Sequence, residues 1–183
     1  MVNRMAAMGA VLALIFLPVS LQAAAPVKAP APAKAVDLNR FYSGRWIEIG
    51  RRPMKLTDGC VAGTTDYQVL SPTKVDVLDG CRADTPTGKL KTIGGPGRIG
   101  DPGFNAKLHV KYRFLGFIPV SRDYWVLDHD DAYSWFISAD PAFENLWIYT
   151  RNPHVEASML KELIGKASAM GYDVTKLEFP AQP

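Results

Sequence analysis

The chain has 183 residues, of which 48% are hydrophobic and 21% charged, the size and composition of a single globular domain. This composition excludes collagen, bulk disorder and a coiled coil. The formal net charge is +3, but residues 1–36 carry three basic residues and no acidic ones, so the rest of the chain is neutral. Because charges of both signs are mixed without a basic stripe, we expect no nucleic-acid partner.

Residues 1–25 have the three-part pattern of a secretory signal peptide. Arg4 precedes an apolar run that ends at Leu17, and Pro18 and the small residues 23–25 follow. The run is shorter than the roughly 20 apolar residues that a membrane-spanning helix needs. No cysteine precedes Cys60 to carry a lipid anchor. We therefore expect an exported protein that is not lipid-anchored.

Residues 26–36 alternate Pro, Ala and Lys. This composition favours extended, polyproline-like conformations and offers nothing to bury. We interpret the segment as a linker, which is either a tether that holds the domain clear of a surface or a remnant of signal cleavage. The folded domain is then expected over residues 37–183.

Cys60 and Cys81 are the only cysteines of the chain. In an exported protein such a pair is more often a structural disulfide than a metal or catalytic site. Two alternating runs lie between them, at 64–70 and 74–78, and predict a hairpin with the cysteines at its open ends. The bond would stabilise the fold by roughly 3 kcal/mol. With three scattered histidines besides, the chain offers no zinc site, and we expect no metal or cofactor.

Seven further runs combine apolar and polar residues in the alternating pattern of strands. They cover residues 46–52, 89–93, 106–114, 123–127, 133–138, 146–150 and 172–177. With the two strands of the hairpin they make nine short strands in one domain, which predicts a sandwich or an antiparallel barrel.

One segment, residues 153–170, follows a helical period instead. Pro153 suits a first helical position, and Gly171 suits the left-handed residue that ends a helix. Apolar residues recur at every fourth position, at Val155, Met159, Leu163 and Ala167. We therefore expect one helix near the C-terminus.

Residues 94–97 read Gly-Gly-Pro-Gly, which could suggest a phosphate-binding loop. They lack the spacing of a Walker motif, and no helical pattern follows them. We interpret them as a bend or bulge in a barrel strand.

Three segments resemble motifs of the lipocalin family, in particular its bacterial, apolipoprotein D-like branch of outer-membrane lipoproteins. Residues 41–46 resemble the Gly-x-Trp opening of the first strand, residues 130–133 the acidic turn between the sixth and seventh strands, and residues 147–153 the end of the eighth strand. The resemblance covers residues 38–179. It implies an all-β fold: an eight-stranded antiparallel up-and-down β-barrel with one C-terminal α-helix and a short ninth strand.

In such a barrel the motifs meet at one end, which forms a structural floor. The residues expected there are Gly44, Trp46, Asp130, Tyr133 and Arg151. The resemblance implies that Arg151 lies across the Trp46 ring, a cation–π contact worth about 2 kcal/mol when partly desolvated. Cys60 and Cys81 are expected at the opposite end, the mouth.

An eight-stranded barrel is just wide enough to enclose one small ligand. Alternation and the resemblance give the candidate ligand contacts Glu48, Tyr67, Val69, Val75, Val77, Leu108, Val110, Tyr112, Tyr124, Val126, Phe136, Trp147 and Tyr149. Such a lining suits an acyl chain whose head group is held by hydroxyls or a carboxylate. About half of these residues, those near the floor, should only pack the core.

The connection between the fifth and sixth strands, residues 114–120, is unusually apolar for a loop in water. Its large apolar residues include Leu115, Phe117 and Ile118. It could be a lid, a lip that dips into a membrane surface, or a homodimer contact. Three basic residues are expected to flank the same rim and to favour an anionic head group: Arg51, Arg52 and Lys55.

The leading hypothesis is a lipocalin in the periplasm or at the outer membrane. It would store or transport a small hydrophobic ligand, a fatty acid or lysophospholipid, without catalysis. The alternative is an enzyme that acts on a lipid or isoprenoid held in the barrel. Against it, neither cysteine should be free, and no Ser-His-Asp set falls on the inward positions.

Overall fold

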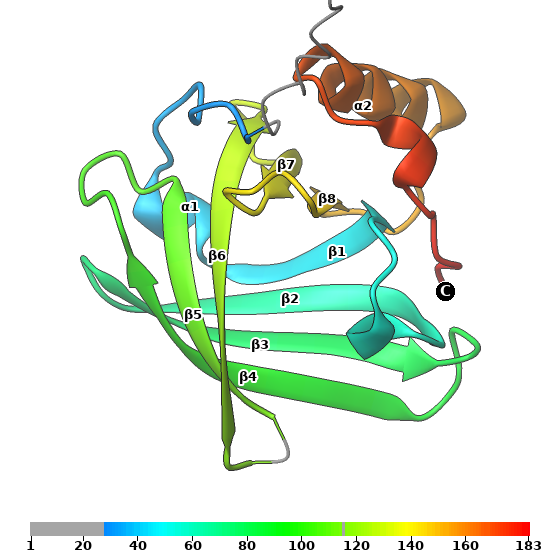
Figure 1. The fold of residues 1–183 in the computed structure, drawn as a ribbon, viewed down its shortest axis with the longest axis horizontal. Coiled ribbons are helices and arrows are strands. Elements are labelled where there is room, and N and C mark those ends of the chain that lie inside the picture. The colour runs from blue at the N-terminus through cyan, green and yellow to red at the C-terminus, as the bar shows by residue number, and fades with distance from the viewer. Residues whose placement is uncertain (1–27, 115) are drawn as a thin grey trace, which may run out of the picture.

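The computed structural model describes residues 28–114 and 116–183, so the signal-peptide prediction lies outside the described residues. Eight antiparallel strands, each paired with the next and the last with the first, close a barrel (Figure 1). They are β1 (Gly44–Arg51), β2 (Cys60–Ser71), β3 (Lys74–Ala83), β4 (Leu90–Ile99), β5 (Lys107–Phe114), β6 (Ile118–His129), β7 (Trp135–Ala139) and β8 (Leu146–Thr150). The predicted up-and-down barrel is confirmed.

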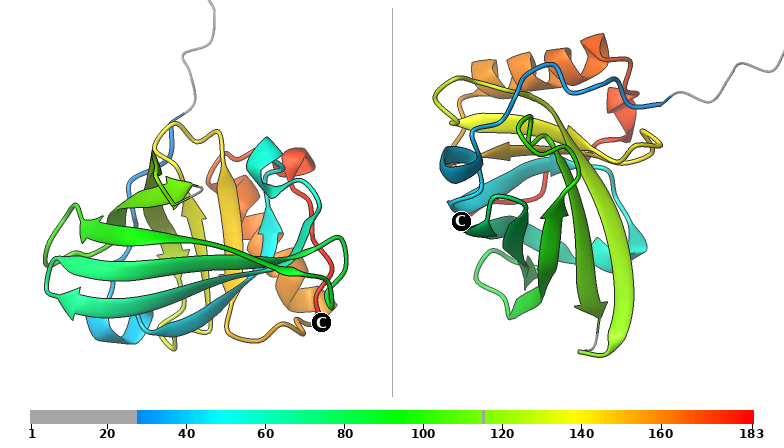
Figure 2. Two further views of the ribbon diagram at one scale, coloured as in Figure 1. Left: turned by 90° about the horizontal axis from the view of Figure 1, so that it is seen from below. Right: turned by 90° about the vertical axis from the view of Figure 1, so that its left-hand side faces the viewer.

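Short helical segments flank the barrel, and one longer helix covers its side. They are α1 (Leu38–Phe41), η1 (Lys55–Thr57), α2 (Ala157–Ala169) and η2 (Val174–Lys176). The buried face of α2, Leu163 and Ala167, packs with the outward side chains of β7 and β8. Figure 2 shows the helix lying over these strands. β7 and β8 are therefore covered on both faces. No helix among the described residues is long and apolar enough to cross a membrane.

The predicted helix is confirmed, but it begins later than expected. α2 starts at Ala157 rather than at Pro153, because the Asn152 side chain accepts the His154 amide and holds residues 152–154 in a turn. The helix ends as expected. Gly171 has φ +92°, in the left-handed region that favours glycine, and follows the last helical turn.

The predicted ninth strand at 172–177 is wrong. Residues 174–176 form the 3-10 turn η2 instead, because the Asp173 carboxylate caps the amide and hydroxyl of Thr175. Pairing begins only afterwards, where Glu178 forms an isolated bridge with Arg51 of β1. The Ala62 amide of β2 then donates to the carbonyl of Ala181. We call residues 178–182 the C-terminal segment; it lies where β1 and β2 no longer pair with each other.

The described part of the expected linker, residues 28–36, packs against the barrel. Ala29 and Val36 are buried, so the expectation that this segment buries nothing is wrong for these residues. The amides of Ala29, Ala33 and Val36 each donate to a carbonyl of the barrel or its loops. The Lys34 ammonium lies 3.7 Å from the Asp128 carboxylate. The extended segment 28–36 is thus held on the barrel surface by its backbone hydrogen bonds and by one buried apolar residue at each end, Ala29 and Val36.

The glycine-rich residues 94–97 lie inside β4, which pairs with β3 without any shift of register. There is therefore no bulge in this pairing, and that part of the prediction is wrong. A Cβ atom at Gly95 would lie 2.1 Å from the Lys111 carbonyl oxygen, and one at Gly97 would lie 2.9 Å from the Leu108 side chain. The glycines allow β5 and the core to approach β4 closely.

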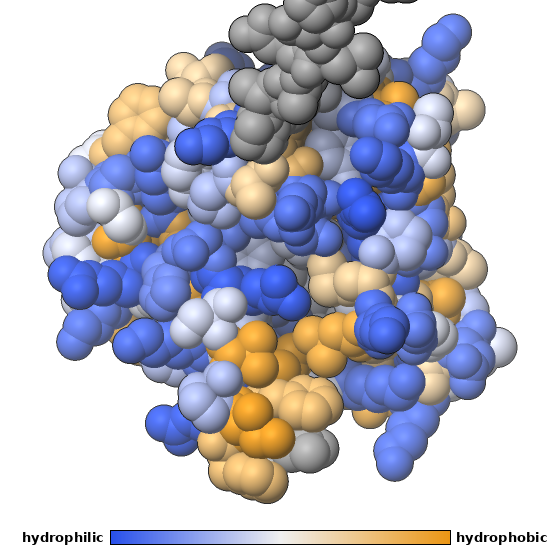
Figure 3. Space-filling view, in the orientation of Figure 1, coloured by the Kyte–Doolittle hydropathy of each residue, from blue (hydrophilic) through white to orange (hydrophobic). Residues whose placement is uncertain are grey.

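The predicted loop at 114–120 is mostly strand. β5 continues to Phe114 and β6 already begins at Ile118, its pairing partner, so the two strands form a long hairpin. Phe117 is 76% exposed at the tip, and Phe114 and Ile118 are also exposed. Figure 3 shows an apolar patch over this hairpin tip. Leu115 lies outside the described residues.

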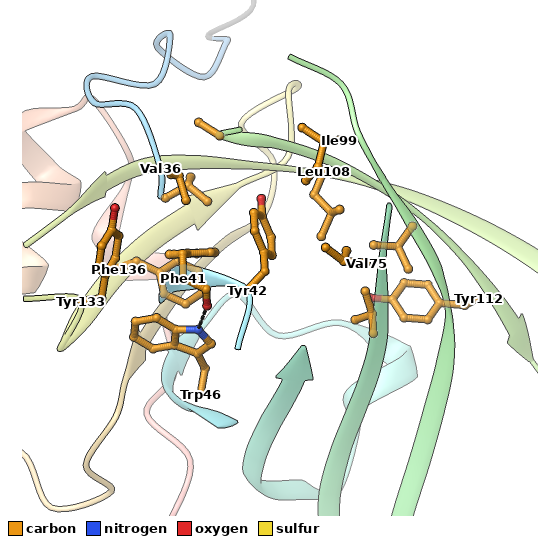
Figure 4. Close-up of a cluster of buried hydrophobic side chains, with 14 residues drawn as sticks. Val36, Phe41, Tyr42, Trp46, Val75, Ile99, Leu108, Tyr112, Tyr133 and Phe136 are labelled. Atoms are coloured by element: carbon orange, nitrogen blue, oxygen red, sulfur yellow. Dashed lines mark hydrogen bonds between the residues drawn. The ribbon is translucent and has the colours of Figure 1, made fainter. Parts of the chain in front are cut away.

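At the opposite end, the Arg151 guanidinium lies 3.6 Å from the centroid of the Trp46 ring. It donates to the carbonyls of Ser43 and Arg45, at 2.8 and 2.7 Å. The Trp46 indole N–H donates to the Phe41 carbonyl at 3.0 Å (Figure 4). Both Trp46 and Phe41 are completely buried, so this end of the barrel is sealed.

The other floor residues hold the turns around this contact. Gly44 has φ +60° and lies under the Arg151 guanidinium. The Asp130 carboxylate accepts the amides of Ser134 and Trp135. The Tyr133 hydroxyl accepts the Asp37 amide at 2.7 Å, which ties the start of α1 to the turn between β6 and β7.

Replacement of either partner in the floor contact should destabilise the fold. For Trp46→Ala we expect a loss of about 3–5 kcal/mol in the free energy of unfolding, because a completely buried ring is removed. Arg151→Ala should lose about 1–3 kcal/mol, because carbonyls at the barrel end lose their donor. Urea unfolding measures both. Arg98→Ala, an exposed position on β4, is the control that should change little, and wild-type stability of Trp46→Ala would contradict this account of the floor.

Candidate functional site

A cavity of about 310 Å³ lies between the packed core and the mouth of the barrel. Its inner end is polar and is formed by Glu48, Thr65, Asp79, Tyr112, Tyr124 and Tyr149. Its upper wall is apolar and includes Met54, Leu56 and Phe114, whereas Ile93 and Val120 line the side of the cavity beside their cross-strand partners Asp79 and Tyr112. Figure 4 shows Tyr112 at the far side of the packed cluster from Trp46, so the cavity begins where the core ends.

The structure divides the predicted ligand contacts into two groups. Five line the cavity: Glu48, Tyr112, Tyr124, Trp147 and Tyr149. The other eight do not line it and pack in the core nearer the floor: Tyr67, Val69, Val75, Val77, Leu108, Val110, Val126 and Phe136. These eight residues pack with one another and with the floor residues Phe41 and Trp46 in one core cluster. They are therefore not part of the candidate site.

Asp79 is the site residue that sequence reasoning missed. It continues the inward series of Val75 and Val77 along β3, but the predicted strand stopped at Leu78, whereas β3 continues to Ala83. One more step of the same alternation would have placed a carboxylate in the barrel. Thr65, its partner on β2, faces the same interior.

The Asp79 carboxylate is held by hydroxyl groups. One oxygen accepts from the Thr65 hydroxyl at 2.7 Å and the other from the Tyr112 hydroxyl at 2.6 Å. The Tyr112 and Tyr124 hydroxyls are 3.0 Å apart. Burial raises the pKa of Asp79 to about 6, although the hydrogen bonds from Tyr112 and Thr65 oppose this shift. Among the described lysines and arginines none forms an ion pair with this carboxylate.

A second charged group lies beside it. Nη1 of Arg51 is 2.7 Å from the Glu48 carboxylate, and Nε is 2.7 Å from the Glu178 carboxylate of the C-terminal segment. Nη2 donates to the Cys60 carbonyl at 2.7 Å. Burial raises the pKa of Glu48 to about 7, against the opposing effect of Arg51. One guanidinium thus joins β1, β2 and the C-terminal segment.

The expectation that Arg51 flanks the rim and favours an anionic head group is wrong, since it is only 3% exposed and is paired with Glu48 and Glu178. The pairing of β1 with β8 shifts register between Glu48 and Gly50, so an irregularity reverses the alternation there. Arg51 consequently faces inward opposite Trp147. Lys55 is exposed, as expected for a rim residue.

The disulfide between Cys60 and Cys81 is present, with the Cα atoms 5.5 Å apart. It joins the start of β2 to the end of β3 at the mouth, and Cys81 lines the cavity. The predicted disulfide is therefore confirmed, and neither thiol is free.

The ladder between β4 and β5 ends before the mouth. It joins residues 97–99 to 108–110, and the strands remain in contact at Gly95, where a Cβ atom would lie 2.1 Å from the Lys111 carbonyl oxygen. A second hollow, of about 370 Å³, lies closer to the mouth and is lined by Lys91, Ile93, Arg113 and Phe114, among others. It shares Ile93, Phe114 and Asp79 with the cavity. A ligand in the cavity could therefore extend into this hollow.

No histidine lines the cavity in the described part of the chain. His109 faces outward, where its Nδ1 lies 2.8 Å from the Asp123 carboxylate. The cavity thus holds carboxylates, phenols and the guanidinium groups of Arg51 and Arg122 around an apolar wall. These groups can fix the head group of an amphiphilic molecule by charge and hydrogen bonding.

The raised pKa of Asp79 predicts how stability depends on pH. The folded state holds the proton up to about pH 6, whereas the unfolded chain releases it near pH 4. The free energy of unfolding should therefore fall as pH rises between these values, by roughly 1–3 kcal/mol from this group. Asp79→Asn should flatten the profile in urea unfolding across this range, and Asp76→Asn, exposed on the same strand, should not. Identical profiles for wild type and Asp79→Asn would disprove the assignment.

The sequence profile of the lipocalin-like domain matches residues 36–182. Temperature-induced lipocalin-1 of Arabidopsis thaliana is 35% identical over 149 residues, 79% of this chain and 78% of that protein. Outer membrane lipoprotein Blc of Citrobacter freundii is 29% identical over 161 residues, 84% of this chain and 87% of that protein.

Among solved structures, insecticyanin from the tobacco hornworm Manduca sexta superposes with a TM-score of 0.67 at 19% identity. The match covers 87% of this chain and 88% of insecticyanin, and it shows a shared fold. Lipocalins are in general proteins that bind small hydrophobic ligands. The closed barrel, the one long helix of the described residues and the profile match lead to one conclusion: the chain belongs to the lipocalin family, with bacterial outer membrane lipoproteins among its relatives.

Proposed function

We propose that this lipocalin is exported to the cell envelope, where it binds and carries an amphiphilic lipid of the fatty acid or lysophospholipid class without catalysis. The observation that carries the proposal is the cavity, which places an apolar upper wall over a polar inner end. A molecule with one apolar and one polar part fits such a lining. The signal-peptide pattern of residues 1–25 and the relatives named as outer membrane lipoproteins support the location.

The tip of the β5–β6 hairpin supports contact with a membrane surface. Phe117 and Ile118 are exposed there, and the second hollow between β4 and β5 lies next to them. Lys91 and Arg113 line this hollow, so anionic lipids would be attracted to it. A symmetric dimer formed through the hairpin tips would instead place Lys91 and Arg113 of one copy near the same residues of the other, and these like charges would repel each other. We therefore favour a bilayer over a second copy as the partner of the tip.

A bulky side chain in the cavity should block ligand binding. We expect Ile93→Trp to weaken the binding of a fluorescent acyl probe to delipidated protein by about tenfold or more, because the indole fills the wall shared by both hollows. Leu78→Trp, on the exposed outer face of β3, is the matched control and should bind as the wild type does. Equal affinity in both variants would place the ligand elsewhere and overturn the proposed site.

The membrane contact can be tested separately. Phe117→Asp should weaken binding to anionic vesicles in a flotation assay, because a charge replaces the most exposed apolar group of the tip. The affinity for the acyl probe should stay unchanged, since Phe117 does not line the cavity. Phe104→Asp, also exposed but at the floor end, should bind vesicles normally. Unchanged vesicle binding with conversion of a dimer to a monomer in sedimentation would favour the dimer instead.

A further inference from the structure

The polarity of the cavity indicates which part of a ligand enters first. An acyl chain that enters a barrel tail first needs an apolar inner end, but here the inner end holds Asp79 and three tyrosine hydroxyls. The apolar side chains of Met54, Leu56 and Phe114 lie on the upper wall instead. The methyl terminus of an acyl chain would displace water from the polar inner end without forming hydrogen bonds in return. This desolvation is unfavourable unless the polar groups of the inner end find other partners. The polar head of a ligand is therefore the part that matches the inner end.

The charges of the inner end select the sign of that head. The Glu48 carboxylate is offset by Arg51, which also contacts Glu178. Asp79 has hydroxyl donors but no ion pair with any described lysine or arginine. Arg122 also lines the cavity, but it is exposed, so water screens its charge. Asp79 is thus the carboxylate of the inner end that has no cationic partner among the described residues.

Aromatic rings surround this charge. Tyr112 and Tyr124 meet through their hydroxyls, and the rings of Tyr124 and Trp147 have centroids 5.1 Å apart. Tyr149 closes the opposite side, with its hydroxyl 3.4 Å from the Thr65 hydroxyl. A carboxylate with free lone pairs, phenolic oxygens and aromatic faces together bind an ammonium group well. They offer little to a second carboxylate, which would be repelled in a partly desolvated site.

We propose that the inner end of the cavity binds the positively charged nitrogen of an amphiphile, with Asp79 as its counter-ion and the apolar part of the ligand directed toward the mouth. This inference rests on the proposed function and narrows it. A lipid with an ammonium head group satisfies the site, whereas a fatty acid does not. The second hollow between β4 and β5 gives the apolar part room to extend toward the hairpin tip.

Three probes with the same alkyl chain and different charges test the proposal: decylamine, decanol and decanoate. Isothermal titration calorimetry at neutral pH, below the critical micelle concentrations, measures their affinities for delipidated full-length protein. We expect decylamine to bind about tenfold or more tightly than decanol, and decanoate to bind least tightly. In Asp79→Asn the preference for decylamine over decanol should disappear, while Asp76→Asn, on the outer face of the same strand, should retain it.

The outcomes are distinguishable. Decanoate binding as tightly as decylamine to the wild type, or an unchanged amine preference in Asp79→Asn, would overturn the inference but leave a lipid carrier. Failure of all three probes to bind would overturn the proposed function together with the inference. The wild-type series gives an answer even if Asp79→Asn does not fold, and circular dichroism of the variant shows whether it does.

Discussion

Stacking of the Arg151 guanidinium on the Trp46 ring closes one end of the barrel, and the division of the interior depends on this closure. Because the floor is sealed, the side chains above it pack into a continuous core that includes Val75, Val110 and Phe136. The unfilled volume can then lie only toward the mouth, where the strands diverge. The contact between Arg151 and Trp46, together with the tilt of the strands, thus leaves the floor half of the barrel interior packed and the mouth half hollow.

A polar layer separates these halves. Burial against the core removes water from the Asp79 and Glu48 carboxylates. Hydrogen bonds from hydroxyl groups compensate Asp79 for this loss, and the Arg51 guanidinium compensates Glu48. Burial nevertheless raises the pKa of both carboxyls, which means that their charged forms are held at some expense of stability. Such an arrangement is common where a protein binds something, because a ligand can supply the missing compensation. The fold tolerates the layer because the core below it is well packed.

Much of the barrel could be predicted because alternation and the three motifs report on residues that are close in sequence. The polar layer could not be predicted in full. The irregularity near Gly50 reverses the direction of Arg51, and it is visible only in the pairing with β8, about a hundred residues away. Asp79 was missed because the predicted strand ended at Leu78, although the alternation of Val75 and Val77 extends to Asp79. The packing of Ala29 and Val36 depends on a surface that exists only after the barrel has formed.

The pairing of the two chain ends has a consequence for the order of folding. β1 is bounded by β8 on one side, and the C-terminal segment bridges to β2 on the other, so the last residues of the chain complete the wall around the first strand. Contacts of such sequence separation form slowly and late. Synthesis must therefore reach the C-terminal segment before the barrel can seal, and until then its strands remain open to chaperones.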